Sequence, residues 1–124
     1  ERAEELLEFV GLYQKRHLMA GSLSFGQQKL LEFAMALMNE PKMLLLDEPT
    51  AGINPTLING LLERLERANS DLGITLLVIE HNMRVVMNLA QRIYCLAHGQ
   101  LLAEGLPEDV RNDQRVVDAY LGAS

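Results

Sequence analysis

Two short, uninterrupted apolar runs constrain the fold of this chain more than any other feature. The first is Met43-Leu44-Leu45-Leu46, and the second extends from Ile74 to Ile79, broken only by Thr75. Neither run alternates with polar residues, which is typical of strands buried on both faces of a parallel sheet. Both are far shorter than the roughly 20 apolar residues that span a bilayer. The runs therefore predict two strands inside an α/β domain.

The segment between the two runs has the pattern of an amphipathic helix. Asn54-Pro55 is a typical helix start, with an N-cap residue followed by proline at the first helical position. One apolar stripe at helical spacing follows, formed by Leu57, Ile58, Leu61, Leu62 and Leu65. Strand, helix and strand in this order form a βαβ unit, so the two strands are expected to be parallel neighbours.

Turn and capping signals place the other elements before and after this unit. The expected elements are helices over residues 1–10 and 24–40, a helix from Asn82 to Ala90, a hairpin of residues 93–97 and 101–104, a helical turn from Pro107, and a last helix from Asp113 to Gly122. The hairpin turn at His98-Gly99 suits a tight two-residue loop. The fold class predicted from these elements is α/β.

The composition excludes several kinds of protein and of site. The chain has 124 residues, 48% of them hydrophobic, which suits one domain with a packed core. A net charge of −6 argues against binding of nucleic acid or of an anionic membrane surface. The single cysteine, Cys95, excludes an internal disulfide, and its apolar neighbours predict a buried thiol. With neither a signal peptide nor a membrane span in the sequence, we expect a soluble intracellular protein.

Charged and polar residues follow both predicted strands. Asp47-Glu48 ends the first run and Glu80-His81 ends the second. Parallel α/β sheets bind ligands at the carboxyl ends of their strands. An acidic pair there suits a Mg²⁺ ligand followed by a base that positions water, and His81 suits a hydrogen bond to a phosphate or to the attacking water. Each segment taken alone also fits a capped strand end or a surface loop.

A third candidate is the start of the helix at residue 24. Ser24 and Gln27 fit a capping box, and Gly26 between them leaves the backbone accessible. The free N–H groups and the positive end of the helix dipole favour phosphate oxygens at this position. Capping and phosphate binding both remain open, because backbone donors are left after the cap is made.

Taken in order, these segments resemble the nucleotide-binding domain of ABC transporters. The similar segments are Leu23 to Gln28 (signature motif), Met43 to Pro49 (Walker B strand and catalytic glutamate), Ala51 to Pro55 (D-loop) and Val78 to His81 (switch histidine). Intervals of 21 residues from Gly26 to Asp47 and 33 from Glu48 to His81 suit the family. The resemblance covers nearly the whole chain, and only the second half of the family's domain.

Details of four segments are similar to one branch of that family, the ATP-binding subunits of branched-chain amino-acid importers. They are Phe25 within the signature, Ala51 to Pro55, Glu80 to Met83, and Asp118 to Gly122. The last segment suggests a natural carboxyl end at or near Ser124. Phe25 stands where many relatives have glycine, and Asn54 stands where many have aspartate. These two departures leave the roles of both positions open.

The resemblance implies a partial P-loop NTPase-like sheet of mainly parallel strands with flanking helices. Residues 1–40 would end the helical signature subdomain, and residues 41–124 would form the C-terminal part of the ATPase core. The cofactors implied are ATP and Mg²⁺. Asp47 would hold the Mg²⁺, Glu48 would polarise the attacking water, and His81 would contact the γ-phosphate and that water.

The resemblance also implies partners, because two copies of the family's domain enclose each ATP between them. Ser24, Gly26 and Gln27 would contact the nucleotide of the partner subunit, while Gly52 and Asn54 belong to the D-loop. ATP hydrolysis would drive membrane permease subunits, with this subunit held through them on the cytoplasmic face of the inner membrane.

The sequence lacks one required motif, the phosphate-binding loop Gly-x-x-x-x-Gly-Lys-Ser/Thr. Its lysines, Lys15, Lys29 and Lys42, do not follow glycine. We therefore expect the C-terminal part of an ATPase subunit, inactive alone and prone to self-association through uncovered strands. Two alternatives stay open: a naturally short, non-catalytic protein that binds partners, and the ATPase of a neighbouring branch for urea or lipopolysaccharide transport.

Overall fold

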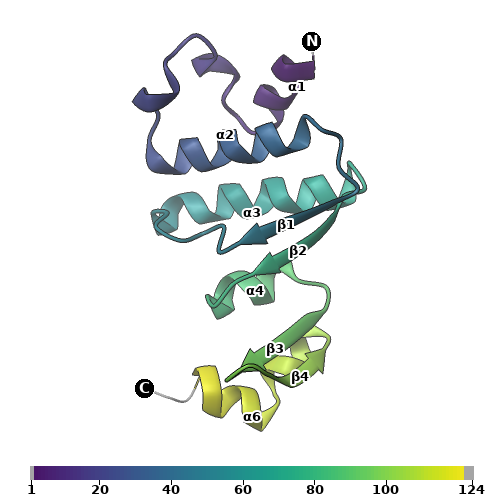
Figure 1. The fold of residues 1–124 in the computed structure, drawn as a ribbon. Coiled ribbons are helices and arrows are strands. Elements are labelled where there is room, and N and C mark those ends of the chain that lie inside the picture. The colour runs from purple at the N-terminus through teal and green to yellow at the C-terminus, as the bar shows by residue number, and fades with distance from the viewer. Residues whose placement is uncertain (1, 122–124) are drawn as a thin grey trace. The chain divides into compact units, whose positions relative to one another are not determined.

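The first compact part of the chain is built on the βαβ unit that the two apolar runs predict. The computed structural model describes residues 2–121, and its first unit is Glu1–Ile79. In this unit β1 (Met43–Asp47) and β2 (Thr75–Ile79) pair in parallel, with α3 (Pro55–Ser70) between them in sequence (Figure 1). The register pairs Met43 with Thr75 and Asp47 with Ile79. The predicted parallel neighbours are confirmed.

Helices cover one face of this pair. α1 (Arg2–Phe9) and α2 (Phe25–Leu37) precede β1, and the segment between them contains two 3₁₀ turns, Tyr13–Lys15 and Ala20–Ser22. α2 and α3 run side by side, with α3 next to the strands (Figure 1). The buried apolar side chains of this unit are Leu6, Val10, Leu12, Phe33, Ala34, Leu37, Leu44, Ile53, Leu61, Leu62, Leu65, Ala68 and Ile74.

The helix starts predicted from the sequence are confirmed in this unit. Ser24 Oγ accepts the N–H of Gln27 at 3.1 Å, and Gln27 Oε1 accepts the N–H of Ser24 at 2.9 Å, which completes the capping box of α2. Asn54 Oδ1 accepts the N–H of Thr56 at 3.0 Å at the start of α3. These bonds satisfy amide groups that have no carbonyl partner within the helix.

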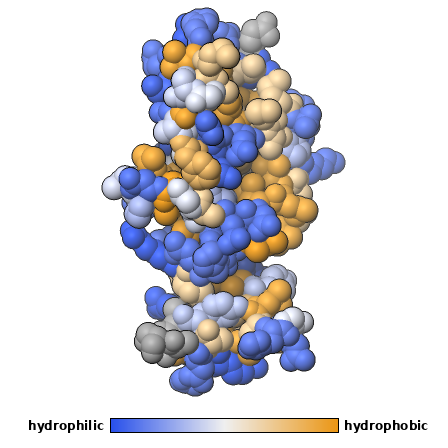
Figure 2. All heavy atoms as spheres, turned by 60° about the vertical axis from the view of Figure 1, so that its left-hand side comes forward, coloured by the Kyte–Doolittle hydropathy of each residue, from blue (hydrophilic) through white to orange (hydrophobic). Residues whose placement is uncertain are grey.

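The prediction that both strands are buried on both faces is wrong for this chain. Burial alternates along them, because helices cover a single face: Leu44 is buried, and Leu46, Leu76 and Val78 are half-buried. The opposite face leaves Met43 50%, Leu45 71%, Leu77 47% and Ile79 60% exposed. We call these four side chains the open sheet face. Figure 2 shows hydrophobic surface gathered on the right of the view, at the height of the strands in Figure 1.

The second compact unit, Glu80–Ser124, is built around an antiparallel hairpin. Its elements are α4 (Met83–Leu89), β3 (Ile93–Ala97), β4 (Gln100–Gly105), α5 (Pro107–Arg111), α6 (Gln114–Val116) and a final π-type turn, Val117–Leu121. His98 and Gly99 both have positive φ, 51° and 75°, as a primed two-residue turn requires. The predicted hairpin is confirmed. The predicted helix end at Gly122 lies outside the described residues.

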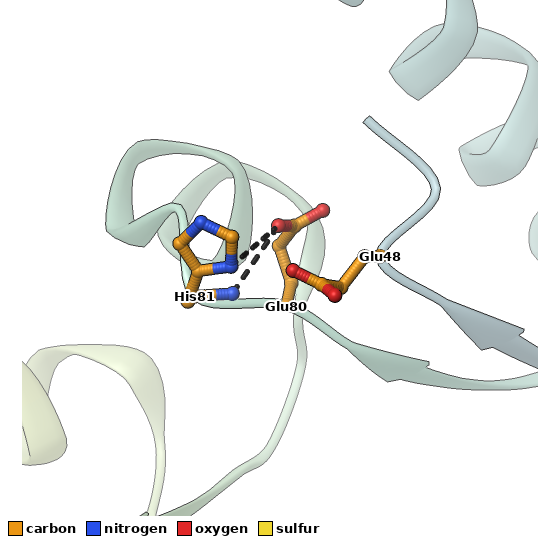
Figure 3. Close-up of side chains that lie close together, drawn as sticks. All are labelled: Glu48, Glu80 and His81. Carbon is orange, nitrogen blue, oxygen red and sulfur yellow. Dashed lines mark hydrogen bonds and ion pairs between the residues drawn. The ribbon is translucent and has the colours of Figure 1, made fainter. Parts of the chain in front are cut away.

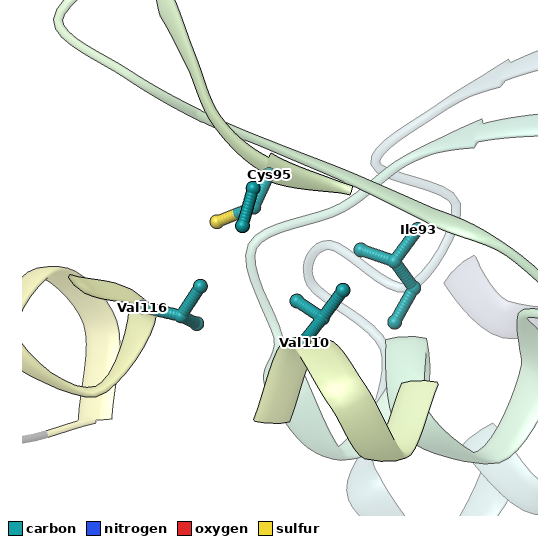
Figure 4. Close-up of a cluster of buried hydrophobic side chains, with 5 residues drawn as sticks. Ile93, Cys95, Val110 and Val116 are labelled. Carbon is teal, nitrogen blue, oxygen red and sulfur yellow. The ribbon is translucent and has the colours of Figure 1, made fainter. Parts of the chain in front are cut away.

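A small apolar core holds the second unit together. Ile93 and Cys95 of β3 face Val110 of α5 and Val116 of α6 (Figure 4), and Ala103 of β4 belongs to the same buried cluster. Burial raises the pKa of the Cys95 thiol, and the nearby Asp113 carboxylate raises it further, so the sulfur stays protonated at neutral pH. The prediction of a buried, apolar Cys95 is confirmed, since its exposed fraction is 7%.

Side-chain caps hold the starts of two helices in the second unit. Asn82 Oδ1 accepts the N–H of Val85 at 3.4 Å, and Asp113 Oδ1 accepts the N–H of Arg115 at 2.9 Å. Hydrogen bonds from Arg115 hold the pKa of Asp113 below its usual value. Both predicted caps, Asn82 and Asp113, are therefore confirmed.

The predicted subdomain boundary after residue 40 refers to the whole domain of the family and stays a prediction. The division after Ile79 describes the compactness of this chain alone. Among residues 2–121, no helix is both long and apolar enough to cross a membrane.

Candidate functional site

The end of β1 presents two adjacent carboxylates. Asp47 is the last residue of the strand and is exposed, and Glu48 follows it, also exposed. The N–H of Glu48 donates to the carbonyl of Ile79 at 2.7 Å, so the parallel pairing continues one residue beyond the strand. Glu48 has φ of 47°, a left-handed conformation that is uncommon for a residue with a side chain. A backbone held in this way marks a candidate functional position.

Two successive turns connect Glu48 to the start of α3. The N–H of Ala51 donates to the carbonyl of Glu48 at 3.1 Å, and the N–H of Ile53 donates to the carbonyl of Thr50 at 3.2 Å. Thr50 and Ile53 are buried, at 6% and 8% exposure. The predicted D-loop segment is therefore a hydrogen-bonded turn region in which two side chains are buried.

The N-termini of α2 and α3 meet at glycines. A Cβ on Gly26 would lie 3.1 Å from Leu57 Cδ1 and 3.9 Å from Ile53 Cγ2. A Cβ on Gly52 would lie 3.1 Å from the ring of Phe25. Glycine at both positions lets the predicted signature segment and the predicted D-loop approach each other closely. The structure thus brings together the predicted signature residues and the predicted D-loop residues.

The first turn of α2 keeps backbone donors for a ligand. The side chains of Ser24 and Gln27 are used in the capping box. The amides of Phe25 and Gly26 stand in the first helical turn, where no carbonyl one turn earlier can accept from them. Together with the helix dipole they make this end attractive to an anion, so capping by Ser24 and Gln27 leaves anion binding possible.

In the second unit, a buried carboxylate holds the predicted switch-histidine segment. The Glu80 side chain is 2% exposed, and its Oε1 accepts the N–H groups of His81 at 3.2 Å and Asn82 at 3.4 Å (Figure 3). The His81 ring is 75% exposed, with Nδ1 4.0 Å from the same oxygen. Glu80 therefore fixes the backbone from which the histidine projects.

Sequence reasoning gave Glu80 no role of its own. The available signal was its place directly before the His81-Asn82 helix start, where a carboxylate can accept amide hydrogens and complement the helix dipole. His81 belongs to a different compact unit from the other predicted site residues, and its geometry is described within that unit.

Two family sequence models match the chain at its two ends. The ABC transporter model matches residues 1–51. The model of the branched-chain amino acid ATP-binding cassette transporter matches residues 100–124. The chain resembles the C-terminal half of an ABC-transporter ATP-binding cassette.

Curated relatives agree with this resemblance. The probable branched-chain amino acid transport ATP-binding protein LivG of Archaeoglobus fulgidus is 42% identical over 123 residues, which cover 99% of this chain and 48% of the relative. The high-affinity branched-chain amino acid transport ATP-binding protein LivG of Escherichia coli is 40% identical over 122 residues, which cover 98% of this chain and 48% of the relative. The chain thus spans about half the length of the curated relatives it matches.

Solved cassettes share the fold. The ADP conformation of MJ1267, an ATP-binding cassette of an ABC transporter, superposes with a TM-score of 0.87 at 38% identity, covering 98% of this chain and 49% of that one. A nucleotide-free ATP-binding cassette from an ABC transporter gives a TM-score of 0.86 at 38% identity with the same coverage. The α/β ABC ATPase fold predicted from the sequence is confirmed.

The capping role of Asn54 leads to a stability prediction. Replacing Asn54 with alanine removes the acceptor for the Thr56 amide and should lower the free energy of unfolding by about 1 kcal/mol. Asn54→Asp keeps an acceptor and should preserve stability. Urea denaturation measures the differences, with Asn59→Ala, an exposed change inside α3, as the control. Equal stability of the Asn54 and Asn59 alanine variants would contradict the assignment.

Proposed function

We propose that this chain is the C-terminal part of the ATP-binding subunit of an ABC importer for branched-chain amino acids. The observation that carries the proposal is the connection from Asp47 to Asn54, which joins an acidic strand end to a D-loop packed against a capped signature helix. The match of residues 100–124 to the branched-chain amino acid model favours this branch over urea or lipopolysaccharide transport. The relatives named LivG support the same branch.

The acidic strand end suits Mg²⁺ and an attacking water. Asp47 offers the hard oxygen ligand that Mg²⁺ prefers, at the carboxyl end of a parallel strand. Mg²⁺ held by Asp47 would supply positive charge to offset the negative charge of the phosphates. The backbone of Glu48 is held by the hydrogen bond from its N–H to the carbonyl of Ile79. Its carboxylate orients the attacking water and polarises the O–H bond of that water. His81 donates to the γ-phosphate from a backbone that Glu80 fixes.

The signature helix serves the other nucleotide of a dimer. Ser24, Gly26 and Gln27 stand at the end of α2 whose amides and dipole attract phosphate. In the proposed head-to-tail dimer this end contacts the γ-phosphate bound to the partner subunit, while Glu48 serves the nucleotide of its own subunit. Closure of the dimer on ATP and reopening after hydrolysis drive permease subunits, which hold the complex on the cytoplasmic face of the membrane.

The catalytic role of Glu48 is testable in the complete ATPase subunit. Glu48→Gln keeps the shape of the side chain and removes its charge, so turnover should fall by at least about a hundredfold while ATP remains bound. A phosphate-release assay measures turnover, and retention of radiolabelled ATP on the dimer measures binding. Glu63→Gln, an exposed change on α3, is the matched control and should be fully active. Normal turnover of the Glu48 variant would move the catalytic role elsewhere.

The 124-residue chain alone should bind nucleotide weakly and hydrolyse none. Backbone donors and the lysine of the phosphate-binding loop supply most of the grip on the β- and γ-phosphates, and this sequence has no such loop. Calorimetric titration of the isolated chain with ATP and Mg²⁺ tests the expectation. A dissociation constant in the micromolar range would contradict it.

The isolated chain should also self-associate through the open sheet face. Met43, Leu45, Leu77 and Ile79 are each about half exposed or more, and each strand has an edge that no other described strand pairs. Apolar patches and unpaired strand edges both recruit further chains, and a second copy supplies the same strands. We expect a dimer or larger oligomer in light scattering, with the fraction of monomer rising on dilution.

A charge on the open sheet face should oppose this association. Leu45→Lys places an ammonium group at the most exposed of the four positions and should shift the chain toward monomer. Met35→Lys changes a side chain on α2 that is 62% exposed and should leave the association unchanged. A compact monomer at high concentration, with cooperative unfolding, would show that the sheet face does not associate.

A further inference from the structure

The side chain of Phe25, in the predicted signature segment, reaches the predicted D-loop in this structure. It is the first residue of α2 and is 52% exposed. The position of a Cβ on Gly52 is 3.1 Å from Cε2 and 3.6 Å from Cζ of the ring. Lys29, one turn along α2, places its Nζ 5.3 Å from the ring centroid. The ring therefore lies between its own helix and the D-loop.

Gly52 allows the predicted D-loop to contact this ring. Gly52 has φ of 74°, a conformation that glycine adopts without cost. Any side chain at residue 52 would also meet the aromatic carbons of Phe25. The positive φ of residue 52 and the nearby Phe25 ring thus both require glycine at this position. The backbone of the D-loop therefore lies directly against the ring.

A short path leads from this contact to the acidic strand end. Gly52 lies between Ala51, whose N–H bonds the carbonyl of Glu48, and Ile53, whose N–H bonds the carbonyl of Thr50. The buried side chains of Thr50 and Ile53 anchor the path. These turns therefore connect Gly52 to the backbone of Glu48, which is itself held by the bond to Ile79.

We propose that Phe25 is a positioning residue that couples the two nucleotide sites of the dimer. This inference rests on the proposed function, in which Ser24 and Gly26 serve the nucleotide of the partner subunit and Glu48 serves its own. The contact with Gly52 joins those two sets of residues within one chain. In this proposal, binding of the partner subunit's nucleotide shifts the N-terminal end of α2, and the Phe25 ring then displaces the D-loop. That displacement reorients the carboxylate of Glu48, which serves the other nucleotide site.

A phenylalanine ring suits this role because it is rigid and reaches the neighbouring backbone. Its two side-chain torsions leave few conformations to lose when the contact forms. Alanine at position 25 would end well short of Gly52. Since Phe25 is about half exposed, removal of its ring should leave the fold intact, and effects on coupling can be separated from unfolding.

The test uses Phe25→Ala in the complete ATPase subunit, with Phe25→Tyr as the conservative variant. We expect the unchanged protein to hydrolyse ATP with a Hill coefficient above 1. In the alanine variant the Hill coefficient should fall to 1 and kcat should fall about tenfold, with KM changed by less than about twofold. The tyrosine variant keeps the ring and should retain both cooperativity and kcat.

Two further measurements separate this role from a merely structural one. Met35→Ala removes another exposed apolar side chain from α2, 62% exposed, and should change none of the kinetic values. The α-proton resonances of Gly52 should shift in Phe25→Ala and stay in place in Met35→Ala, because an aromatic ring perturbs the nuclei that it touches.

The outcomes are distinct. Cooperative hydrolysis with an unchanged kcat in Phe25→Ala would overturn the coupling role, as would a Hill coefficient of 1 in the unchanged protein. A lower kcat with unchanged cooperativity would also overturn it, since a local structural defect lowers rate alone. If Glu48→Gln retained full turnover, the proposed function itself would fail, whatever Phe25→Ala showed.

Discussion

The parallel pairing of β1 with β2 is the interaction on which the candidate site depends. Its register, Asp47 beside Ile79, fixes where the first strand stops, and the bond from the Glu48 amide to the Ile79 carbonyl extends it by one residue. Because that bond holds Glu48 in a left-handed conformation, the chain turns sharply after Asp47. The backbone that carries the carboxylates of Asp47 and Glu48 is consequently fixed by hydrogen bonds of the sheet.

The remainder of the site follows from how glycine is distributed around that turn. Gly26 and Gly52 allow the starts of α2 and α3 to pack against each other, with Leu57 and Phe25 in the space that side chains would take. The start of α2 and the turns that lead from Glu48 to α3 therefore belong to one packed region of the first unit. The proposal of coupled sites needs this packing, because independent segments would have no means of transmitting a displacement.

Local chemistry in the sequence was sufficient to predict most of the fold. The Ser24–Gln27 capping box, the Asn54 cap and the His98-Gly99 turn are all local, and all three are present. The prediction that both faces of the strands are buried was wrong, and Leu45, for example, is 71% exposed. An apolar run indicates that a strand can be buried, but it does not indicate which elements are present to cover it. Glu80 and the Phe25–Gly52 contact were missed, since both depend on side-chain directions that sequence spacing leaves undetermined.

The central claim is that this chain contributes halves of two different nucleotide sites, and mixed dimers of the complete ATPase subunit test it most directly. In one dimer Glu48→Gln and Gly26→Asp are in the same subunit; in the other they are in opposite subunits. Single-turnover hydrolysis should give no phosphate from the first, because both sites are damaged. It should give one phosphate per dimer from the second, in which both changes damage the same site. Equal phosphate yields from the two dimers would contradict the account.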